Sequence, residues 1–291
     1  MAAIGNFDGV HLGHQKLLER VKNSAKRLNC ASLVITFEPQ PLEFFLPEKT
    51  VPRLTKWREK FSLLSESDID NVLVVRFNQR FSALTAEAFC SELLFGQLGV
   101  KHIIVGNDFR FGAGREGDIE FLEKKGKELG FTVEVMPSVM MDGERISSTR
   151  VREALAKGDH VLAERLLGRP YSMMGRVVYG HQRGRIIGFP TANIYLHRAR
   201  SPVQGVYAVR LYGISDEGLP GVANVGIRPT VGGTRALLEV HLFDFNATIY
   251  GKTVRVAFCK KLRDEKRFAN LDLLKEQIMK DAIDARSYFD D

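Results

Sequence analysis

The sequence predicts two folds in succession, a doubly wound α/β domain built on a parallel sheet and then an antiparallel β-barrel domain with a terminal helix. Up to about residue 168, short β-rich runs alternate with amphipathic helical stretches, a pattern typical of parallel sheets covered by helices. After that point, runs rich in Val, Tyr and Phe follow one another between glycine-bearing turns. The Gly168-Arg-Pro170 break separates the two patterns, so we expect domains at residues 1–168 and 169–291.

Each domain has its own set of expected strands. In the first domain they are Ala2–Ile4, Ser32–Thr36, Asn71–Val75, His102–Val105 and Thr132–Val135. A parallel sheet of this kind has its ligand crevice beyond the carboxyl ends of the strands. In the second domain the expected strands are Met174–Tyr179, Gly205–Tyr212, Gly221–Val225, Leu237–Phe243 and Thr253–Lys260. A helix over Leu271–Ile283, with Leu274, Ile278 and Ala282 on its buried face, ends the chain.

The composition is typical of a globular protein, and the spacing of its cysteines indicates neither a metal site nor a catalytic role. Of 291 residues, 44% are hydrophobic and 26% are charged, and no apolar run is long enough to span a membrane. The N-terminus does not have the pattern of a signal peptide, so we expect a cytoplasmic protein without a membrane partner. Cys30, Cys90 and Cys259 are scattered without metal-ligand spacing, and we expect them to be reduced core thiols.

The net charge of +7 is compatible with two classes of partner. A basic protein can bind nucleic acid, or it can bind nucleotides that carry several phosphates. Lys and Arg are spread along the chain rather than clustered, so we expect small-molecule ligands and no nucleic acid. Association into oligomers is compatible with the sequence, which does not report it.

The segment Gly5-Asn-Phe-Asp-Gly-Val-His-Leu-Gly-His-Gln15 is the first candidate site. It lies between a short apolar strand and a run in which Leu17, Leu18 and Val21 recur at helical spacing. His14 therefore falls near a helix start, where free backbone N–H groups bind anions. We expect this turn to bind a phosphate group.

Two later loops also follow predicted strands. Phe37-Glu-Pro-Gln-Pro41 is stiffened by its prolines, and a simple strand exit explains it as well as a ligand-facing loop does. Val105-Gly-Asn-Asp-Phe-Arg-Phe-Gly112 places two aromatic residues beside Asp108 and Arg110, which would suit a planar ring with a polar edge. A surface loop with incidental aromatic residues explains the second segment equally well.

The segment Arg145-Ile-Ser-Ser-Thr-Arg-Val-Arg152 leads into a helix. Ser148 or Thr149 can cap that helix, and Arg150 and Arg152 place guanidinium groups near its start. A capped helix with solvated arginines is the usual meaning of such a pattern. Two hydroxyls and two arginines beside a positive helix end would also form a clamp for a triphosphate.

The second half contains two further candidates. Gly180-His-Gln-Arg-Gly-Arg-Ile-Ile-Gly-Phe-Pro-Thr-Ala-Asn-Ile194 could wrap phosphates with backbone N–H groups and offer two oxygen ligands to Mg²⁺. A glycine-rich hairpin between strands is the commoner explanation of such a segment. Glu239 lies within an apolar strand downstream. It is paired structurally, or a general base whose pKa is raised by burial, or a water-facing residue on an edge strand.

Together these segments resemble the bacterial bifunctional riboflavin kinase/FMN adenylyltransferases, also called FAD synthetases. His11-Leu-Gly-His14 matches the turn of the Rossmann-like nucleotidyltransferase superfamily, and Gly5–Gly9, Gly106–Gly112 and Ile146–Arg150 narrow the match to this family. Gly188-Phe-Pro-Thr-Ala-Asn193, Gly226-Ile-Arg-Pro-Thr230 and Leu262-Arg-Asp-Glu-Lys266 match the riboflavin kinase half. The similarity covers essentially the whole chain, with the motifs in the family order.

The resemblance implies a role for each segment. Catalytic roles fall on His11, His14, Arg150 and Glu239, with Glu239 as the base that activates the ribityl hydroxyl. For the adenylyltransferase it implies ATP contacts at Gly5, Asn6, Phe7, Asp8, Gly9, His11, His14, Ser148, Thr149 and Arg150, and flavin contacts at Phe37, Pro39, Asn107, Asp108 and Phe109. For the kinase it implies ATP contacts at Gly180, Gly184, Arg185, Gly188, Pro190, Thr191 and Asn193, with Mg²⁺ held by Thr191 and Asn193. ATP is then the co-substrate, and riboflavin, FMN and FAD are substrates or products.

Two other functions are compatible with parts of the pattern. An adenylyltransferase for another nucleotide-like acceptor, such as a pantetheine or nicotinate nucleotide, would share the histidine motif and carry an unrelated accessory domain. The Pro-Thr-x-Asn turn and Glu239 argue against that alternative. A nucleic-acid-binding module is favoured only by the positive charge.

Overall fold

A computed structural model describes residues 1–49, 51–180, 188–196, 198, 200–230 and 233–290. The chain forms two compact units, each with its own sheet. Unit 1 contains Met1–Val51 and Lys56–Ser147, and unit 2 contains Pro52–Thr55 and Ser148–Asp291. The functional boundary between residues 168 and 169 stays a prediction.

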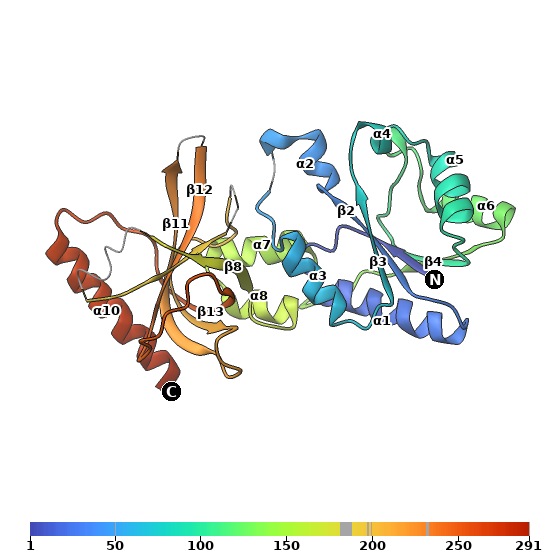
Figure 1. Cartoon of the computed structure of the whole chain (residues 1–291). Helices are drawn as coiled ribbons and strands as arrows, with labels where there is room; N and C mark the ends of the chain where they lie inside the picture. The colour runs from blue at the N-terminus through green and yellow to red at the C-terminus, as the bar shows by residue number, and fades with distance from the viewer. Residues whose placement is uncertain (50, 181–187, 197, 199, 231–232, 291) are drawn as a thin grey trace. The chain divides into compact units, whose positions relative to one another are not determined.

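Unit 1 is built on a parallel sheet of five strands (Figure 1). The strands are β1 (Ala2–Ile4), β2 (Leu33–Glu38), β3 (Asn71–Arg76), β4 (His102–Gly106) and β5 (Thr132–Met136), in the order β3-β2-β1-β4-β5. All four strand pairs are parallel, which confirms the predicted sheet. The strand order reverses between β1 and β4, and the crevice of such a sheet lies at that point. The turn that begins at Gly5 directly follows β1 there.

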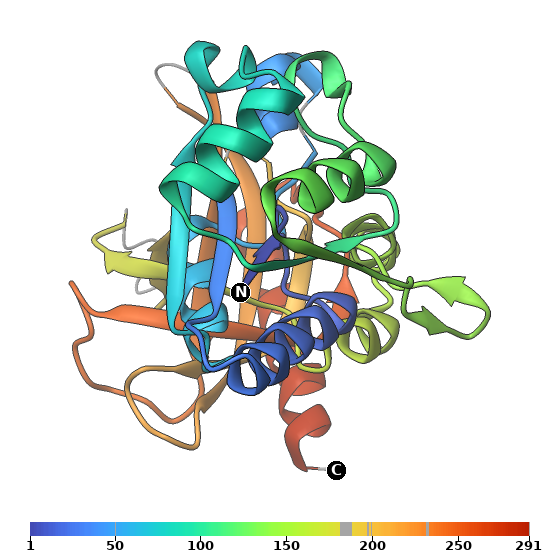
Figure 2. The same cartoon turned by 90° about the vertical axis from the view of Figure 1, so that its right-hand side faces the viewer.

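Helices connect the strands of unit 1. They are α1 (Leu12–Arg27), α2 (Pro41–Phe45), α3 (Trp57–Ser65), α4 (Gln79–Ser82), α5 (Ala86–Ala88) and α6 (Ile119–Leu129), with the short helices η1 (Pro47–Lys49) and η3 (Ala113–Arg115) and the π-helix η2 (Phe89–Gln97). After β5, strands β6 (Met140–Met141) and β7 (Glu144–Arg145) form a hairpin that projects from its surroundings (Figure 2). The hairpin ends directly before the Ile146–Arg150 motif.

Both faces of this sheet are buried, because side chains alternate between them along each strand. Ala3 and Ile104 belong to a core formed with apolar residues of α1 and α3. Their neighbours Ile4 and Ile103 point to the opposite face and pack with residues of α5, η2 and α6. The sheet is therefore doubly wound, as predicted (Figure 1).

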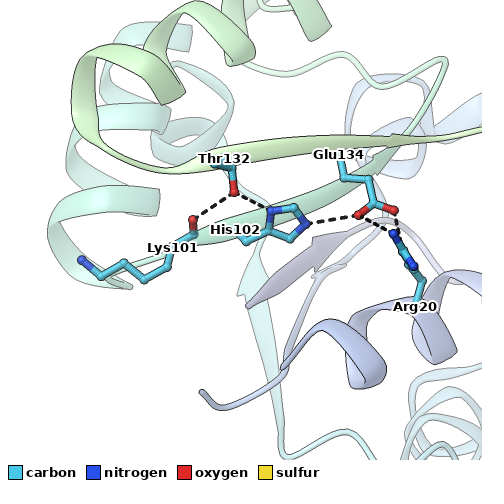
Figure 3. Close-up of polar contacts among 5 residues, drawn as sticks. All are labelled: Arg20, Lys101, His102, Thr132 and Glu134. Carbon is cyan, nitrogen blue, oxygen red and sulfur yellow. Dashed lines mark hydrogen bonds and ion pairs between the residues drawn. The ribbon is translucent and has the colours of Figure 1, made fainter. Parts of the chain in front are cut away.

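A polar network joins α1 to the amino-terminal ends of β4 and β5 (Figure 3). The Arg20 guanidinium donates to both carboxylate oxygens of Glu134, with Nε 2.6 Å from Oε1. This hydrogen bond holds the pKa of Glu134 below its usual value. Nε2 of His102 lies 3.4 Å from the same carboxylate, and its Nδ1 contacts the Thr132 hydroxyl. The network lies at the opposite edge of the sheet from the Gly5 turn, so we assign it a structural role.

Unit 2 is a closed barrel of six strands with helices beside it. The strands are β8 (Ser172–Val178), β9 (Ala192–Tyr195), β10 (Gly205–Tyr212), β11 (Leu219–Thr230), β12 (Gly233–Leu242) and β13 (Thr253–Arg263), and the helices are α7 (Ser148–Lys157), α8 (His160–Leu167) and α10 (Leu271–Asp290). All the paired strands are antiparallel, which confirms the predicted barrel. Strand β9 is absent from the sequence-based set, because Pro190 and Thr191 directly before it are typical of a turn.

Helix α10 covers part of the outer barrel surface over β10 and β11. Its predicted buried face is confirmed, since Leu274 and Ile278 are half-buried and Ala282 is buried. Nε and Nη2 of Arg263 on β13 donate to the buried carboxylate of Asp281 at 2.8 and 2.6 Å. Apolar packing and this ion pair, together with that between Arg286 and Asp244, therefore fix the helix on the barrel.

The segment Pro52–Thr55 belongs to unit 2, although residues of unit 1 flank it in sequence. Three side chains of unit 2 donate to three consecutive carbonyl oxygens of this segment: Arg152 to Pro52, Tyr171 to Leu54 and Arg198 to Arg53. The Leu54 side chain is fully buried. The segment is thus held through its backbone as well as by packing.

A buried histidine on α8 makes the stability of unit 2 sensitive to acid. His160 is 6% exposed, its ring packs edge-on against Tyr207, and neither ring nitrogen has a hydrogen-bond partner among the described residues. Burial, helped by the charge of Lys261, lowers its pKa from 6.5 to about 4. As pH falls through this range, the unfolded chain takes up a proton that the folded chain does not, so the folded state is destabilised.

We therefore expect His160→Leu to remove part of this acid sensitivity. Between about pH 7.5 and about pH 5, His160 should lower the free energy of unfolding of the wild-type protein by roughly 2 kcal/mol. The variant should lack this contribution, and the measurement is urea unfolding of both proteins at the two pH values. Equal losses in the two proteins would contradict the role given to His160.

The three cysteines are free thiols, as predicted. Cys90 is buried, whereas Cys30 and Cys259 are half-buried. Burial raises the pKa of Cys90 to about 12 and also raises that of Cys259, so neither thiol forms the reactive thiolate readily at neutral pH. Within the described ranges, every helix is too short or too polar to cross a bilayer.

Candidate active sites

The histidine turn, residues 5–14, has a backbone shape that few sequences permit. Phe7, Gly9 and Val10 have positive φ angles of 47°, 81° and 40°. Glycine adopts such angles freely, whereas Phe7 and Val10 are strained there and are held by their buried side chains. The N–H of Gly5 donates to a backbone carbonyl of β2 at 3.1 Å. The turn is therefore a fixed element at the carboxyl end of β1.

The two histidines of the turn lie face to face at the start of α1. His11 is the N-cap residue of the helix, and its Nδ1 accepts a hydrogen bond from the backbone N–H of His14 at 3.3 Å. The two rings stack, with centroids 3.7 Å apart and planes 19° from parallel. The structure thus brings together the two residues that the sequence pattern singles out, beside the free N–H groups of a 16-residue helix.

His14 is held in its neutral form. Burial lowers its pKa well below the usual value, and the charges of His11, Lys60 and Arg145 act in the same direction. Its Nδ1 is enclosed and has no hydrogen-bond partner within the described part of the chain. A neutral imidazole donates from one nitrogen and accepts at the other, so His14 can contact a phosphate oxygen without first taking up a proton.

Two cations near His14 are absent from the sequence-based candidates. Lys60 of α3 is fully buried, and its Nζ lies 3.4 Å from the hydroxyl of Thr36. Arg145 of β7 lies with Nη1 2.9 Å from a carboxylate oxygen of Asp108. The place of Arg145 at the head of the Ile-Ser-Ser-Thr-Arg motif could have signalled it, whereas Lys60 resembles any helical lysine in the sequence.

Polar residues of the loop after β4 form hydrogen bonds and an ion pair with other residues of unit 1. The arginine of β7 holds the pKa of the Asp108 carboxyl below its usual range, and Oδ1 of Asn107 accepts from Ser138 at 3.2 Å. The Phe109 and Phe111 rings stack with centroids 5.4 Å apart. Phe111 belongs to the buried core, so it is needed for packing, whereas Phe109 is half-buried. Contact of Asn107, Asp108 and Phe109 with a flavin stays a prediction.

Aromatic rings gather at the carboxyl ends of β2 and β3. The Phe37 ring lies 5.8 Å from that of Phe77, and Phe44 and Phe45 of α2 lie 5.5 and 5.6 Å from the same ring. Pro39 is half-buried in the loop between β2 and α2, and Phe45 is 57% exposed. This accessible apolar cluster favours a ligand-facing loop over a simple strand exit.

In unit 2, three polar residues face one another across adjacent barrel strands. Glu239 on β12 is paired in register with Asn193 on β9 and with Asn224 on β11. Paired residues point to the same face of a sheet, so the three side chains form a row. Leu238 and Val240 are fully buried on the opposite, inner face. Because β12 is paired on both sides, the edge-strand interpretation of Glu239 is wrong.

The Pro-Thr-x-Asn turn lies beside this row. Nδ1 of His241, on the same face of β12, lies 2.9 Å from the carbonyl oxygen of Pro190. Nδ2 of Asn193 donates to the carbonyl oxygen of Thr191 at 3.4 Å, which orients the amide. A Cβ at position 180 would collide with that amide, so Gly180 is required by the close approach of the two segments.

The oxygen atoms at this turn suit Mg²⁺. The ion favours oxygen ligands, retains several waters and usually takes only one or two protein groups together with nucleotide phosphates. The hydroxyl of Thr191 and the amide oxygen of Asn193 are of this kind, and the Asn193 amide is held against a glycine backbone. Among the described residues there is no cluster of three His, Cys, Asp or Glu side chains that could hold a metal ion without a nucleotide.

The other predicted contacts are placed as follows. Gly188 has a φ of 86°, which favours glycine at the entrance to the turn. Gly184 and Arg185 lie outside the described residues. Ser148, Thr149 and Arg150 form the first turn of α7 and belong to unit 2.

Unit 1 has stacked histidines at a helix start beside a parallel sheet. Unit 2 has a carboxylate beside a Pro-Thr-x-Asn turn on a barrel. Together these features define a nucleotide-dependent transferase with two sites. The model of the FAD synthetase family matches residues 1–150, and the model of the riboflavin kinase family matches residues 167–289. The chain belongs to the bifunctional riboflavin kinase/FMN adenylyltransferase family, with the adenylyltransferase in the N-terminal part and the kinase in the C-terminal part.

Relatives of known name are similar over almost their whole length. The bifunctional riboflavin kinase/FMN adenylyltransferase of Escherichia coli (strain K12) is 53% identical, over 98% of this chain and 91% of that protein. The protein of the same name from Haemophilus influenzae is 48% identical, over 98% and 93%. A crystal structure from Streptococcus pneumoniae, titled a macrolide-efflux protein, superposes with a TM-score of 0.81 and 32% identity, over 96% of this chain and 91% of that one.

Proposed function

We propose that this enzyme makes FMN from riboflavin and ATP, and FAD from FMN and a second ATP. The two reactions take place in separate catalytic domains, whose boundary falls between residues 168 and 169. The observation that carries the proposal is the presence of both constellations in one chain. These are the stacked His11–His14 pair and the Asn193–Glu239–Asn224 row.

In the kinase step, the 5′-hydroxyl oxygen of riboflavin forms a bond to the γ-phosphorus of ATP. The bond from that phosphorus to the bridging oxygen breaks, and ADP leaves. Glu239, which lies between Asn193 and Asn224 on neighbouring strands, accepts the proton of the hydroxyl. Gly180, Gly188 and Pro190 bring backbone groups close to the phosphates, and Gly184 and Arg185 of the same segment complete this set.

Thr191 and Asn193 would hold Mg²⁺ through their side-chain oxygens. When bound, the ion neutralises charge on the phosphates of ATP. The amide of Asn193 is oriented for this role by its hydrogen bond to the Thr191 carbonyl oxygen.

In the adenylyl step, a phosphate oxygen of FMN forms a bond to the α-phosphorus of ATP. The bond from that phosphorus to the bridging oxygen breaks, and pyrophosphate leaves. The attacking phosphate is already anionic, so no protein base is needed. His11 and His14, with the N–H groups of the histidine turn and α1, align the phosphates and stabilise charge that develops in the transition state.

The remaining contacts of the adenylyltransferase follow from their chemistry. Gly5, Asn6, Phe7, Asp8 and Gly9 shape the turn that receives the ATP phosphates. Ser148, Thr149 and Arg150 offer two hydroxyls and a guanidinium group to the triphosphate. Phe37 and Pro39 offer an apolar surface to the flavin ring, and Asn107, Asp108 and Phe109 offer a polar edge with an aromatic ring.

The proposal is tested by assaying the two reactions separately. Purified protein with ATP, Mg²⁺ and riboflavin should yield FMN and FAD on chromatography, and supplied FMN should yield FAD directly. Absence of FMN would refute the kinase assignment, and absence of FAD from supplied FMN would refute the adenylyltransferase. Phosphopantetheine or nicotinate mononucleotide in place of FMN tests the rival acceptors.

We further propose that the enzyme acts in the cytoplasm and has no nucleic-acid partner. The support is the even distribution of basic residues and the small anionic ligands that both sites suit. Binding of short DNA or RNA that persists at moderate salt would contradict the second part, whereas binding lost as salt rises would be a nonspecific electrostatic effect.

A further inference from the structure

Lys60 is an ionisable residue in the interior of unit 1, and it has no assigned role in either reaction described above. Its side chain on α3 is fully buried, where an ammonium group loses its hydration. Lysine is seldom fully buried unless polar partners offset that loss. One such partner is Thr36 on β2, whose hydroxyl lies 3.4 Å from Nζ of Lys60.

Thr36 in turn forms a hydrogen bond with the histidine turn. Thr36 is also fully buried, and its hydroxyl donates to the carbonyl oxygen of Asn6 at 3.3 Å. A hydroxyl has one proton to donate and lone pairs to accept with, so Thr36 can accept from Lys60 and donate to Asn6 at the same time. A continuous hydrogen-bond chain therefore joins α3 to the backbone of the turn.

We propose that Lys60 is a positioning residue for adenylyl transfer, which holds the histidine turn in its phosphate-binding shape through Thr36 and Asn6. The inference rests on the function proposed for unit 1. The turn needs such support because Phe7 and Val10 are held at positive φ. Lys60 has no exposed surface, so it acts through these residues and not by contact with a substrate.

The buried charge of Lys60 also acts on His14. After burial of the ring, the groups that lower the pKa of His14 are His11 at the start of α1, Lys60 on α3 and Arg145 on β7. The carboxyl of Asp8 is buried in the same turn and carries the opposite charge. Removal of the Lys60 charge should therefore raise the pKa of His14 toward its usual value.

The first test compares Lys60→Met with Arg58→Gln, which removes an exposed charge from the same helix. Met keeps the length of the apolar lysine stem and removes the charge. We expect Lys60→Met to lower kcat/KM for FMN adenylylation roughly 10- to 100-fold, as a displaced site does. It should also raise the pH at which this activity falls on the acid side, measured from about pH 5.5 to about pH 8. Riboflavin phosphorylation by the same protein, and both reactions of Arg58→Gln, should stay within about twofold of wild type.

The second test uses the hydroxyl that links Lys60 to the turn. Thr36→Val removes this hydroxyl and Thr36→Ser keeps it, so only the valine variant should lose adenylylation, by about tenfold. The Lys60→Met/Thr36→Val double variant should lose less than the sum of the two single effects, because both changes break one hydrogen-bond chain. Emission of Trp57, the single tryptophan of the chain, reports whether α3 is folded in each variant, since its ring packs against Phe61.

Three results would overturn the inference. The first is wild-type adenylylation with an unchanged pH profile in folded Lys60→Met. If that variant fails to fold, equal activity of Thr36→Val and Thr36→Ser decides against the inference instead. Failure of the wild-type protein to convert FMN to FAD would remove the proposed function of unit 1 and this inference with it, and that measurement on the wild type distinguishes the two failures.

Discussion

Glu239→Gln is expected to abolish FMN formation and to leave FAD formation from supplied FMN unchanged. Glutamine keeps the size of the side chain and its place between Asn193 and Asn224, but it cannot accept the proton of the 5′-hydroxyl. Loss of a general base lowers a rate by about 100- to 10,000-fold. The measurement is the initial rate of each reaction, followed separately by chromatography of the flavins.

A matched control for this variant is Glu217→Gln, which removes an exposed carboxylate from the loop before β11. Both reactions of the control should be close to those of the wild type. Near-normal phosphorylation of riboflavin by Glu239→Gln would withdraw the role of base from this residue. Loss of both reactions would instead indicate that the change disturbs folding, which urea unfolding would detect.

His14→Ala should have the opposite effect, with loss of FAD formation and intact riboflavin phosphorylation. The change removes one ring of the stacked pair and a neutral group enclosed at the start of α1. Loss of one group that stabilises transition-state charge lowers kcat by about 100- to 1000-fold. The rates are measured with saturating FMN and ATP, and His14→Gln, which keeps a hydrogen-bond donor, should lose less than His14→Ala.

The pH dependence of the wild type gives a further check on His14. Because its pKa is lowered well below 6.5, the ring stays neutral through the range in which an ordinary histidine titrates. FAD formation should therefore show no loss centred near 6.5. His102→Ala, at the opposite edge of the sheet, is the control and should keep adenylylation. A loss centred near 6.5 that is absent from His14→Ala would contradict this account.

Much of the architecture could be predicted because its signals are local. All five strands of the parallel sheet are confirmed, since an apolar run of the right length between amphipathic helices identifies each one without reference to the others. Strand β9 was missed for the opposite reason. Its residues form a strand through pairing with β8 on one side and with β12, which is distant in sequence, on the other, while the preceding Pro190 indicates a turn.

In the candidate sites, too, residues with a local sequence signal could be predicted, whereas residues brought in from distant segments could not. The histidine pair could be recognised because both residues and the helix start lie in one short segment. Lys60 could not be singled out, because it resembles many other lysines in the sequence, and only its place at the head of the Ile-Ser-Ser-Thr-Arg motif marks Arg145. Their relation to His14 arises only when α3 and β7 fold against the histidine turn.

The sequence by itself determined the two fold types, the family and the short segments that carry its motifs, because hydrophobic periodicity and motif spacing are properties of neighbouring residues. Only the tertiary structure decided what surrounds each motif. It places Glu239 between Asn193 and Asn224 on a strand paired on both sides, and it buries Lys60 behind the histidine turn. Burial and long-range pairing depend on segments that meet after folding, so no local pattern encodes them.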